Sequence, residues 1–234
     1  METDKITDYF FSISNMETAE HSKKFFKAEK GGYGYGDRFL GIRVPQIREA
    51  VRKFKNFSIE GTEKLLNSEF HEIRLFALLF MVSKFQKSGS KEKEEIYKIY
   101  MSNTRFINNW DLVDSSAPYI PGEYLFSRDR SVLYKLAESA DLWERRISVI
   151  STFYFIKNNQ FEDTLRITEL LIHDTEDLIH KAAGWMLREI GKRDISAEKK
   201  FLDKFAGIMP RTMLRYSIEK FSREERSKYL YYGK

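Results

Sequence analysis

The segment 108–122, with the sequence NNWDLVDSSAPYIPG, contains the residue types best suited to chemistry. Two carboxylates, Asp111 and Asp114, follow Trp110 closely in an otherwise apolar stretch. Because residues three and four apart are neighbours on a helix, Trp110 and Asp114 are expected to share one helical face. A carboxylate beside an aromatic wall suits a reaction that develops positive charge in its substrate. The segment therefore predicts an active-site helix, with Asp111 as the competing carboxylate.

The composition favours a folded protein that can bind a polyanion. Hydrophobic residues make up 42% of the 234 residues, which excludes a disordered chain. The absence of cysteine excludes disulfides, cysteine metal sites and cysteine nucleophiles. No apolar run approaches the roughly 20 residues that cross a bilayer, and the first residues do not resemble a signal peptide, so an intracellular, cytoplasmic location is expected. A net charge of +5 permits a nucleic-acid partner without requiring one.

Apolar residues recur at the helical period through nearly the whole chain, while alternating strand patterns and hairpin turns are lacking. The sequence therefore predicts an all-α fold. Pro118 and Pro121 are expected to end any helix in the central stretch, because proline lacks the amide hydrogen. Helices are expected at 4–13, 17–30, 45–55, 59–67, 70–87, 91–102, 129–139, 141–157, 160–173, 176–191, 196–206 and 210–221, with a short or frayed one at 222–234.

The segment 31–48 (GGYGYGDRFLGIRVPQIR) is unusually rich in glycine and arginine. One interpretation is a loop that approaches a phosphate backbone, helped by Arg38, Arg43 and Arg48. It does not match a nucleotide-binding P-loop, which needs Gly-Lys-Ser/Thr at its end. The alternative is an ordinary interhelical loop with solvated arginines. Pro45 is expected in the first turn of the following helix.

A weak internal repeat marks the more apolar helices. Arg74, Asp111, Arg145 and Lys181 recur at intervals of 34 to 37 residues, each with a small or polar residue three positions later. This length is near that of HEAT and armadillo repeats. The repeat predicts a HEAT-like superhelix (an α-solenoid) over residues 1–234, as a single domain with a concave face.

On such a face, four side chains could converge. Trp110, Asp114, Arg146 and Trp185 would then form a cationic groove with two indole walls and one carboxylate. The alternatives are that the tryptophans belong to the core and that Arg146 is an ion-pair partner of Asp114. The spacing of the histidines predicts no metal site; they include His71, His173 and His180. Basic residues in the second half that could follow a phosphate backbone are Arg145, Arg146, Lys181, Arg188, Lys192, Arg193, Arg211 and Arg215.

Five motifs in order give the sequence, from about residue 20 to 230, a resemblance to the DNA alkylation repair family, the AlkD-type HEAT-like glycosylases. They are FF-K followed by GYGYGDRFLGIRVPQIR, then NNWDLVDSSAPYI, LWERRISVIST, DLIHKAAGWMLREIGKRD and MPRTMLRYSIEKF.

The resemblance implies a superhelix of paired helices whose concave, basic face holds duplex DNA. It implies excision of cationic purines alkylated at ring position 3 or 7, without a metal or organic cofactor and without a deep pocket for the base. The family's catalytic aspartate corresponds to Asp114, its tryptophans to Trp110 and Trp185, and its cleft arginine to Arg146, whereas Asp111 has no counterpart. Expected DNA contacts are Arg38, Arg43, Arg145, Lys181, Arg188, Arg211 and Arg215.

Two other functions remain open from the sequence. Some relatives bind DNA structures without excising bases, and a helical-repeat scaffold can bind a protein instead. Salt dependence separates them, because DNA affinity falls steeply as salt rises. A monomer is expected by default.

Overall fold

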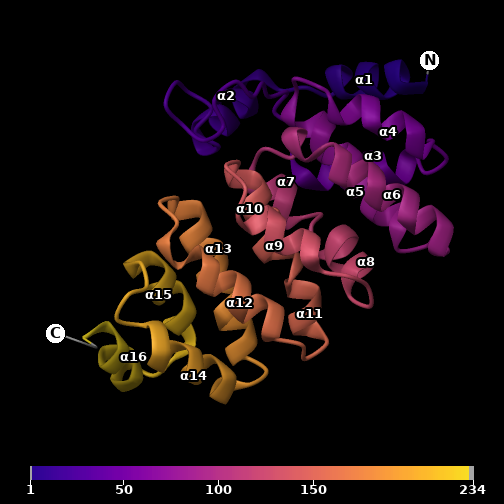
Figure 1. Cartoon of the computed structure of the whole chain (residues 1–234). Helices are drawn as coiled ribbons and strands as arrows, with labels where there is room; N and C mark the ends of the chain where they lie inside the picture. Colours follow the sequence, from indigo (N-terminus) through magenta and orange to yellow (C-terminus); the bar gives the residue numbers. More distant parts are fainter. Residues whose placement is uncertain (1, 232–234) are drawn as a thin grey trace. The chain divides into compact units, whose positions relative to one another are not determined.

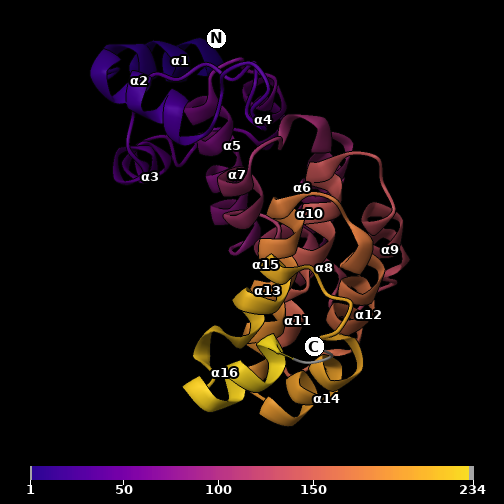
Figure 2. The same ribbon diagram turned by 90° about the vertical axis from the view of Figure 1, so that its left-hand side faces the viewer.

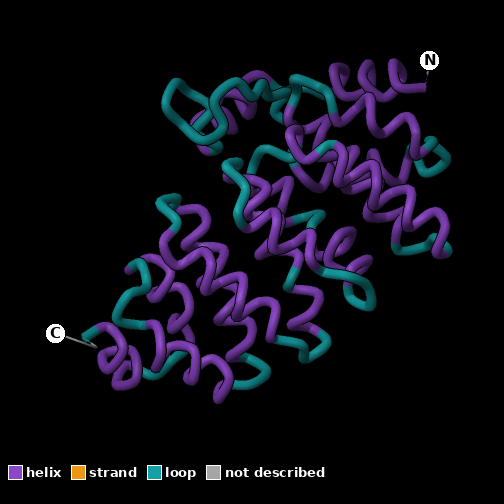
Figure 3. The backbone as a smooth tube through the Cα atoms, viewed as in Figure 1, coloured by secondary structure: helices purple, strands orange, loops and turns teal. Residues whose placement is uncertain are grey.

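The computed structural model describes residues 2–231, and this part of the chain is built of helices and loops (Figures 1 and 3). The β pairing within it is one isolated bridge, between Arg38 and Phe70. The all-α prediction is therefore confirmed. No helix in the described residues combines the length and apolar character needed to cross a membrane. The backbone divides into two compact units, one ending at Ile120 and the other beginning at Pro121; the single domain expected over 1–234 stays a prediction.

The first unit is organised around α5. This helix is apolar around most of its circumference, most of its 15 residues are buried, and it packs against α3, α4, α6 and α7. The elements are α1 (Glu2–Ser12), α2 (Met16–Phe25), α3 (Val44–Lys53), α4 (Ile59–Leu66), α5 (His71–Phe85), α6 (Ser90–Ser102), η1 (Thr104–Phe106), α7 (Trp110–Asp114) and the start of η2 (Pro118–Gly122).

The helix expected at 17–30 ends at Phe25 instead. Lys27 adopts a left-handed φ of 49°, and the amide of Ala28 donates back to the carbonyl of Lys23 at 2.9 Å. This hydrogen bond closes the last turn as a helix-ending motif that usually carries glycine at the left-handed position. Because lysine occupies that position here, no residue type at this point indicates the end of the helix.

The segment 37–42 is hydrogen-bonded to the beginning of α5. The buried carboxylate of Glu72 accepts the backbone amides of residues 40, 41 and 42 at 3.0, 2.8 and 3.3 Å. The backbone amide of His71 donates to the carbonyl of Arg38 at 2.8 Å. These bonds satisfy the amides of an irregular segment and fix its position against α5.

Pro45 and the pair Pro118 and Pro121 differ in how they compare with the prediction. Pro45 lies in the first turn of α3, as predicted. The expectation that Pro118 and Pro121 end a helix was wrong: α7 already ends at Asp114, and both prolines lie in the π-helical turn η2. Because amides at the start of a helix have no partner within it, the missing hydrogens cost little there.

The second unit stacks helices in two layers. Helices α10, α13 and α15 pack in succession, α9 packs on α10, α14 packs on α13, and α12 contacts α9, α10 and α13 (Figure 2 shows the turned view). The bounds are α8 (Glu123–Leu125), α9 (Ser131–Ala137), α10 (Leu142–Ser151), α11 (Phe153–Lys157), α12 (Glu162–Leu170), η3 (Leu171–His173), α13 (Asp177–Gly191), α14 (Ile195–Phe205), α15 (Arg211–Ser217), η4 (Ile218–Lys220) and α16 (Arg223–Leu230).

Gly184 allows α13 and α15 to approach closely. A Cβ atom at this position would lie 2.4 Å from the carbonyl oxygen of Met213 and 2.6 Å from the Cβ of Tyr216. Gly184 is the small residue that the repeat pattern marks three positions after Lys181. Packing explains it, because only glycine leaves room for the neighbouring backbone.

Glu198 is a buried acid in the second unit. It is 1% exposed, and its Oε1 atom has no hydrogen-bond partner among the described residues. Burial raises its pKa from 4.5 to about 8, although the charges of Arg188 and Lys199 oppose the shift. The folded state therefore binds a proton that the unfolded state releases between these two pH values, so stability falls as pH rises from 4.5 to 8.

Replacing Glu198 by glutamine should remove this loss. We expect the variant to be more stable than the wild type at pH 8.5, by on the order of 2 kcal/mol, and the advantage to shrink towards pH 5. Urea unfolding at both pH values measures the difference, with the exposed Glu224→Gln as the matched control. A constant difference between Glu198→Gln and the wild type across this range would contradict the prediction.

Candidate functional site

The short helix α7 carries Trp110 and Asp114 at its two ends. Asn109 precedes it in an extended conformation, and its Oδ1 accepts the backbone amide of Trp110 at 2.9 Å. This cap begins the helix at the tryptophan, so Asp114 follows one turn later on the same face. Both side chains are half-buried. The shared face that the spacing predicts is present.

Aromatic residues from α2 and the glycine-rich segment hold Trp110. The indole centroid lies 6.0 Å from the ring of Phe25 and 5.6 Å from the ring of Phe26. The indole Nε1 donates to the hydroxyl of Tyr33 at 3.3 Å. A Cβ atom at Gly34 would lie 2.4 Å from the carbonyl oxygen of Phe26. Glycine is therefore needed for this part of the loop to lie against the end of α2.

Asp37 lies behind α7 and accepts hydrogen bonds from four side chains. The Nη2 atom of Arg74 lies 2.6 Å from Oδ1 and the Nδ1 atom of His71 lies 3.2 Å from Oδ2. The side-chain amide nitrogens of Asn108 and Asn109 lie 3.4 Å from Oδ1 and Oδ2, respectively. Burial would raise the pKa of Asp37, but the hydrogen bond from His71 and the charge of Arg74 lower it. Asp37 is thus an ionised, buried junction between the glycine-rich segment, α5 and the start of α7.

His71 links this junction to Asp111. Its Nε2 atom lies 2.8 Å from Oδ2 of Asp111, and its ring is stacked at 5.1 Å from Phe39 and lies 4.7 Å from Phe26. Burial alone would lower the pKa of His71, but the charge of Asp111 and hydrogen bonds to Asp111 and Asp37 raise it to about 9. The imidazole therefore carries a positive charge at neutral pH.

The two carboxylates of α7 have different surroundings. The Oδ1 atom of Asp111 accepts a hydrogen bond from the backbone amide of Leu112 at 2.9 Å, and its Oδ2 atom is hydrogen-bonded to His71. Both oxygens therefore have partners within the first unit. Asp114 is half-buried near Tyr100, where burial and the charge of Asp114 raise the pKa of the phenol. The two engaged oxygens favour a structural role for Asp111.

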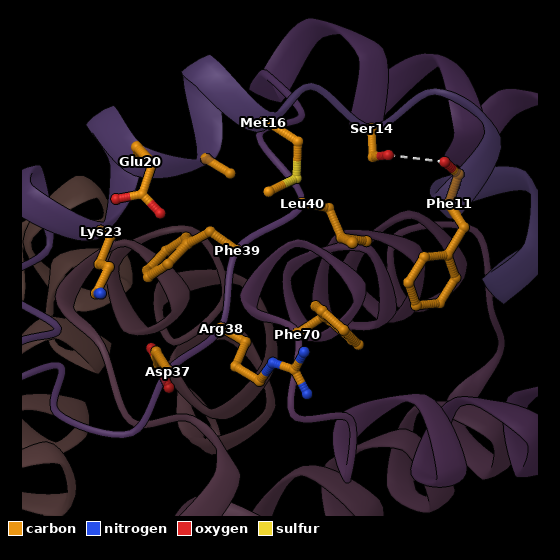
Figure 4. Close-up of a pocket in the computed structure, with 11 residues that line it drawn as sticks. Phe11, Ser14, Met16, Glu20, Lys23, Asp37, Arg38, Phe39, Leu40 and Phe70 are labelled. Atoms are coloured by element: carbon orange, nitrogen blue, oxygen red, sulfur yellow. Dashed lines mark hydrogen bonds between the residues drawn. The ribbon is translucent and has the colours of Figure 1, made fainter.

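A cavity of about 350 Å³ borders the same network (Figure 4). Asp37 and Phe39 belong both to its wall and to the surroundings of His71. The other lining residues are Phe11, Ser14, Met16, Ala19, Glu20, Lys23, Arg38, Leu40 and Phe70. The wall combines aromatic and aliphatic side chains with charges of both signs.

Arg146 and Trp185 belong to the second unit. Arg146 is 5% exposed and its Nη1 donates to the carbonyl of Leu178 at 2.5 Å, which links α10 to α13. Trp185 is half-buried; its Nε1 donates to Glu189 at 3.0 Å and its ring lies 5.7 Å from Phe153. The convergence of these two residues with Trp110 and Asp114 stays a prediction.

The cations expected to contact DNA fall into two groups. Arg145 donates twice to Asp174, at 2.6 and 3.3 Å, and also to the carbonyls of residues 139 and 140, while Arg188 pairs with Glu219. Their side chains are only 15% and 17% exposed, which favours a structural role. The exposed cations are Arg38, Arg43, Arg211 and Arg215, of which Arg38 forms an ion pair with Glu69. Lys181 is half-exposed and forms an ion pair with Asp177.

A matched pair of variants separates these groups. Arg215→Ala should reduce the salt slope of DNA binding by about one phosphate contact and leave stability unchanged. Arg145→Ala should leave the slope unchanged and destabilise the fold by about 2–3 kcal/mol, because it leaves the buried carboxylate of Asp174 without its cation. Fluorescence anisotropy over a salt series and urea unfolding measure the two effects. A reduced slope in a stable Arg145→Ala protein would assign Arg145 to DNA instead.

Sequence reasoning missed most of the network behind α7. In the sequence, Arg74 stands out only as a repeat position, and His71 only as a residue type that can bind a metal. Asp37 carried no signal of its own, because its partners lie 34 to 72 positions later in the chain. The one usable signal was the run Asn108, Asn109 before Trp110, since asparagine is a frequent helix cap.

Among the comparisons with known proteins, one family model matches most of the chain. A model described as "DNA alkylation repair enzyme" matches residues 6–221. A solved structure, the predicted DNA alkylation repair enzyme from Enterococcus faecalis, is similar with a TM-score of 0.68 and 15% identity, over 90% of this chain and 97% of that one. The protein smu.31 from Streptococcus mutans UA159 gives a TM-score of 0.52 and 15% identity, over 94% and 99%. No curated protein matches. At this identity the structural likeness supports the fold alone, and the predicted class of helical-repeat fold is confirmed.

Proposed function

Because the chain belongs to the DNA alkylation repair enzyme family, we propose that it is a DNA glycosylase acting on cationic purines. It would hydrolyse the N-glycosidic bond of purines alkylated at ring position 3 or 7 in duplex DNA. Family membership supports a role in DNA repair. The observation that carries the finer assignment is the geometry of α7, which has an anchored indole and a half-buried carboxylate one turn apart.

The chemistry requires stabilisation of positive charge on the sugar. An alkylated purine is cationic and leaves readily, and its departure gives the deoxyribose oxocarbenium character, as in glycoside hydrolysis. The carboxylate of Asp114 would stabilise this charge and orient the attacking water. Placing a fixed charge against a developing one is often the largest single contribution to catalysis. The inward position of Asp111, which is engaged by His71, supports Asp114 in this role.

Trp110 would contact the sugar through its indole face, where a cation–π interaction contributes about 0.5–2 kcal/mol. Its anchoring by Tyr33 and Phe26 supports this role, because a fixed ring loses no conformational freedom when the substrate binds. In the second unit, the family resemblance implies a second sugar or backbone contact for Trp185 and a phosphate contact for Arg146. The burial of Arg146 and its hydrogen bond to Leu178 favour a structural role for it instead, as for Arg145.

The test is release of the base from a duplex that contains one 7-methylguanine. The protein is expected to release it in a single turnover faster than the spontaneous rate and to leave the unmodified duplex intact. Salt-sensitive binding of the same duplex should accompany release. Salt-sensitive binding without release from any 3- or 7-alkylpurine would indicate a DNA-structure-binding relative. Neither release nor binding would indicate a protein-binding scaffold.

A further inference from the structure

We propose that His71 is a positioning residue for α7, the helix that carries Trp110 and Asp114. The imidazolium of His71 links Asp111, in that helix, to Asp37, in the glycine-rich segment. Base release then depends on the charge of a residue that does not touch the substrate. This inference rests on the glycosylase function proposed above, but part of its test is independent of base release.

The hydrogen bonds themselves require a charged ring. Nε2 of His71 lies 2.8 Å from a carboxylate oxygen of Asp111, and Nδ1 lies 3.2 Å from a carboxylate oxygen of Asp37. An ionised carboxylate only accepts hydrogen bonds, so both ring nitrogens must donate. A neutral imidazole has one N–H and can satisfy only one of the two acids. The link between α7 and the glycine-rich segment therefore exists in full only while His71 is an imidazolium.

The surrounding rings connect this charge to Trp110. The imidazolium contacts the rings of Phe39, at 5.1 Å, and Phe26, at 4.7 Å, and these two rings also stack on each other at 5.4 Å. Aromatic faces attract cations, so both contacts favour the charged ring. The ring of Phe26 in turn lies 5.6 Å from the indole of Trp110. A change in the charge or position of His71 therefore reaches Trp110 through one intervening side chain.

The other charged groups around His71 are few and already paired. Asp37 faces it from the glycine-rich segment and Asp111 from α7, while Arg74 lies on its own helix and opposes its charge. Glu72, the next residue, is turned to the backbone amides of residues 40–42. Two carboxylates thus face two cations. Loss of the proton from His71 leaves one more anion than cation and removes one of the two hydrogen bonds that the ring donates to these acids.

The direction of the pH effect follows from these contacts. Burial lowers the pKa of His71, but the charge of Asp111 and the hydrogen bonds to both acids raise it to about 9, above the ordinary 6.5. The stabilisation of the charged ring is fully present below pH 6.5 and is lost as pH rises through 9. Release of the base should therefore decline on the alkaline side as α7 loses its link.

The first experiment measures single-turnover release of 7-methylguanine from pH 6 to pH 10, after subtraction of the spontaneous rate. It compares the wild type with His71→Gln and Asp111→Asn, and uses the exposed His173→Gln as the matched control. His71→Gln should be about 10²-fold slower at neutral pH, the cost typical of a misplaced catalytic group, and should lack the alkaline decline. Asp111→Asn should move the decline to lower pH, because it removes the main charge that raises the pKa. His173→Gln should follow the wild type.

The second experiment needs no catalysis. Nitrogen NMR of labelled histidine follows the protonation of His71, and the indole Nε1 signal of Trp110 is followed in the same samples. We expect both signals to titrate together near pH 9 in the wild type and at lower pH in Asp111→Asn. The Trp110 signal should not titrate in this range in His71→Gln. If His71→Gln does not fold, the wild type and Asp111→Asn still decide the question.

The outcomes separate the two proposals. Release by His71→Gln at the wild-type rate and with the wild-type pH profile would overturn the positioning role and leave the glycosylase function standing. The same holds if the wild type releases the base but Trp110 does not follow His71. If no alkylated duplex is cleaved, the glycosylase function fails, and a Trp110 signal that tracks His71 would still establish the structural link. If the signals of His71 and Trp110 titrate at different pH values, the structural link is overturned as well.

Discussion

Asp114→Asn is expected to slow base release by about 10²–10³-fold while the protein remains folded and bound to DNA. The amide has nearly the shape of the carboxylate, so packing within α7 is kept, but it has no negative charge to set against the developing charge of the sugar. Single-turnover release of 7-methylguanine measures the loss, and anisotropy with the same duplex measures binding. The exposed Asp8→Asn is the matched control and should retain the wild-type rate.

The result distinguishes Asp114 from its neighbour in the same helix. Asp111→Asn should alter the pH profile, because Asp111 acts through His71, whereas Asp114→Asn should lower the rate at every pH. If Asp114→Asn released the base at the wild-type rate, the charge would have to come from another group and the assignment of the catalytic carboxylate would be wrong.

Arg74→Met is expected to lower the free energy of unfolding by about 3–5 kcal/mol, the usual cost of leaving one member of a buried ion pair without its partner. The side chains of Arg74 and Asp37 are each 4% exposed and lie 2.6 Å apart. Arg74 also donates to the carbonyl of Ser68 at 2.8 Å and to Asn108 at 3.1 Å. Methionine keeps much of the volume of the side chain but none of these donors.

Urea unfolding at pH 7 measures this effect, with Arg52→Met on the exposed side of α3 as the control for loss of an arginine. The control should change stability by less than about 0.5 kcal/mol. A similarly small change for Arg74→Met would show that Asp37 is sufficiently stabilised by His71 and the two asparagines. In that case the arginine would not be essential to the junction.

The sequence predicted the helices well because their signals are local. The apolar period located α5 and α13 within a few residues, and Pro45 marked the start of α3. The single helix expected at 141–157 is instead divided into α10 and α11. The errors lie where local rules were broken by particular residues. Lys27 ends α2 in a backbone conformation that usually calls for glycine, and Pro121 lies inside a helical turn rather than after one.

The candidate site was predictable only in part, for the same reason. Trp110 and Asp114 share α7, so their spacing alone placed them on one face. The residues that hold this helix are brought together from distant segments. The pairing of Asp37 with Asn109 joins residues 72 positions apart, and no local pattern reveals it. Glycine richness in the segment 31–48 suggested a surface loop near phosphate, yet at Gly34 the glycine serves close packing against Phe26.

The anchoring of the segment 37–42 by Glu72 also affects how this region opens. A glycine-rich loop usually exchanges its amide hydrogens with water quickly. Here the backbone amides of residues 40–42 donate hydrogen bonds to the buried carboxylate of Glu72 in α5. Hydrogen exchange at these amides therefore requires the beginning of α5 to move away as well. The free energy of opening measured at residues 40–42 should then equal that of the beginning of α5, a core helix.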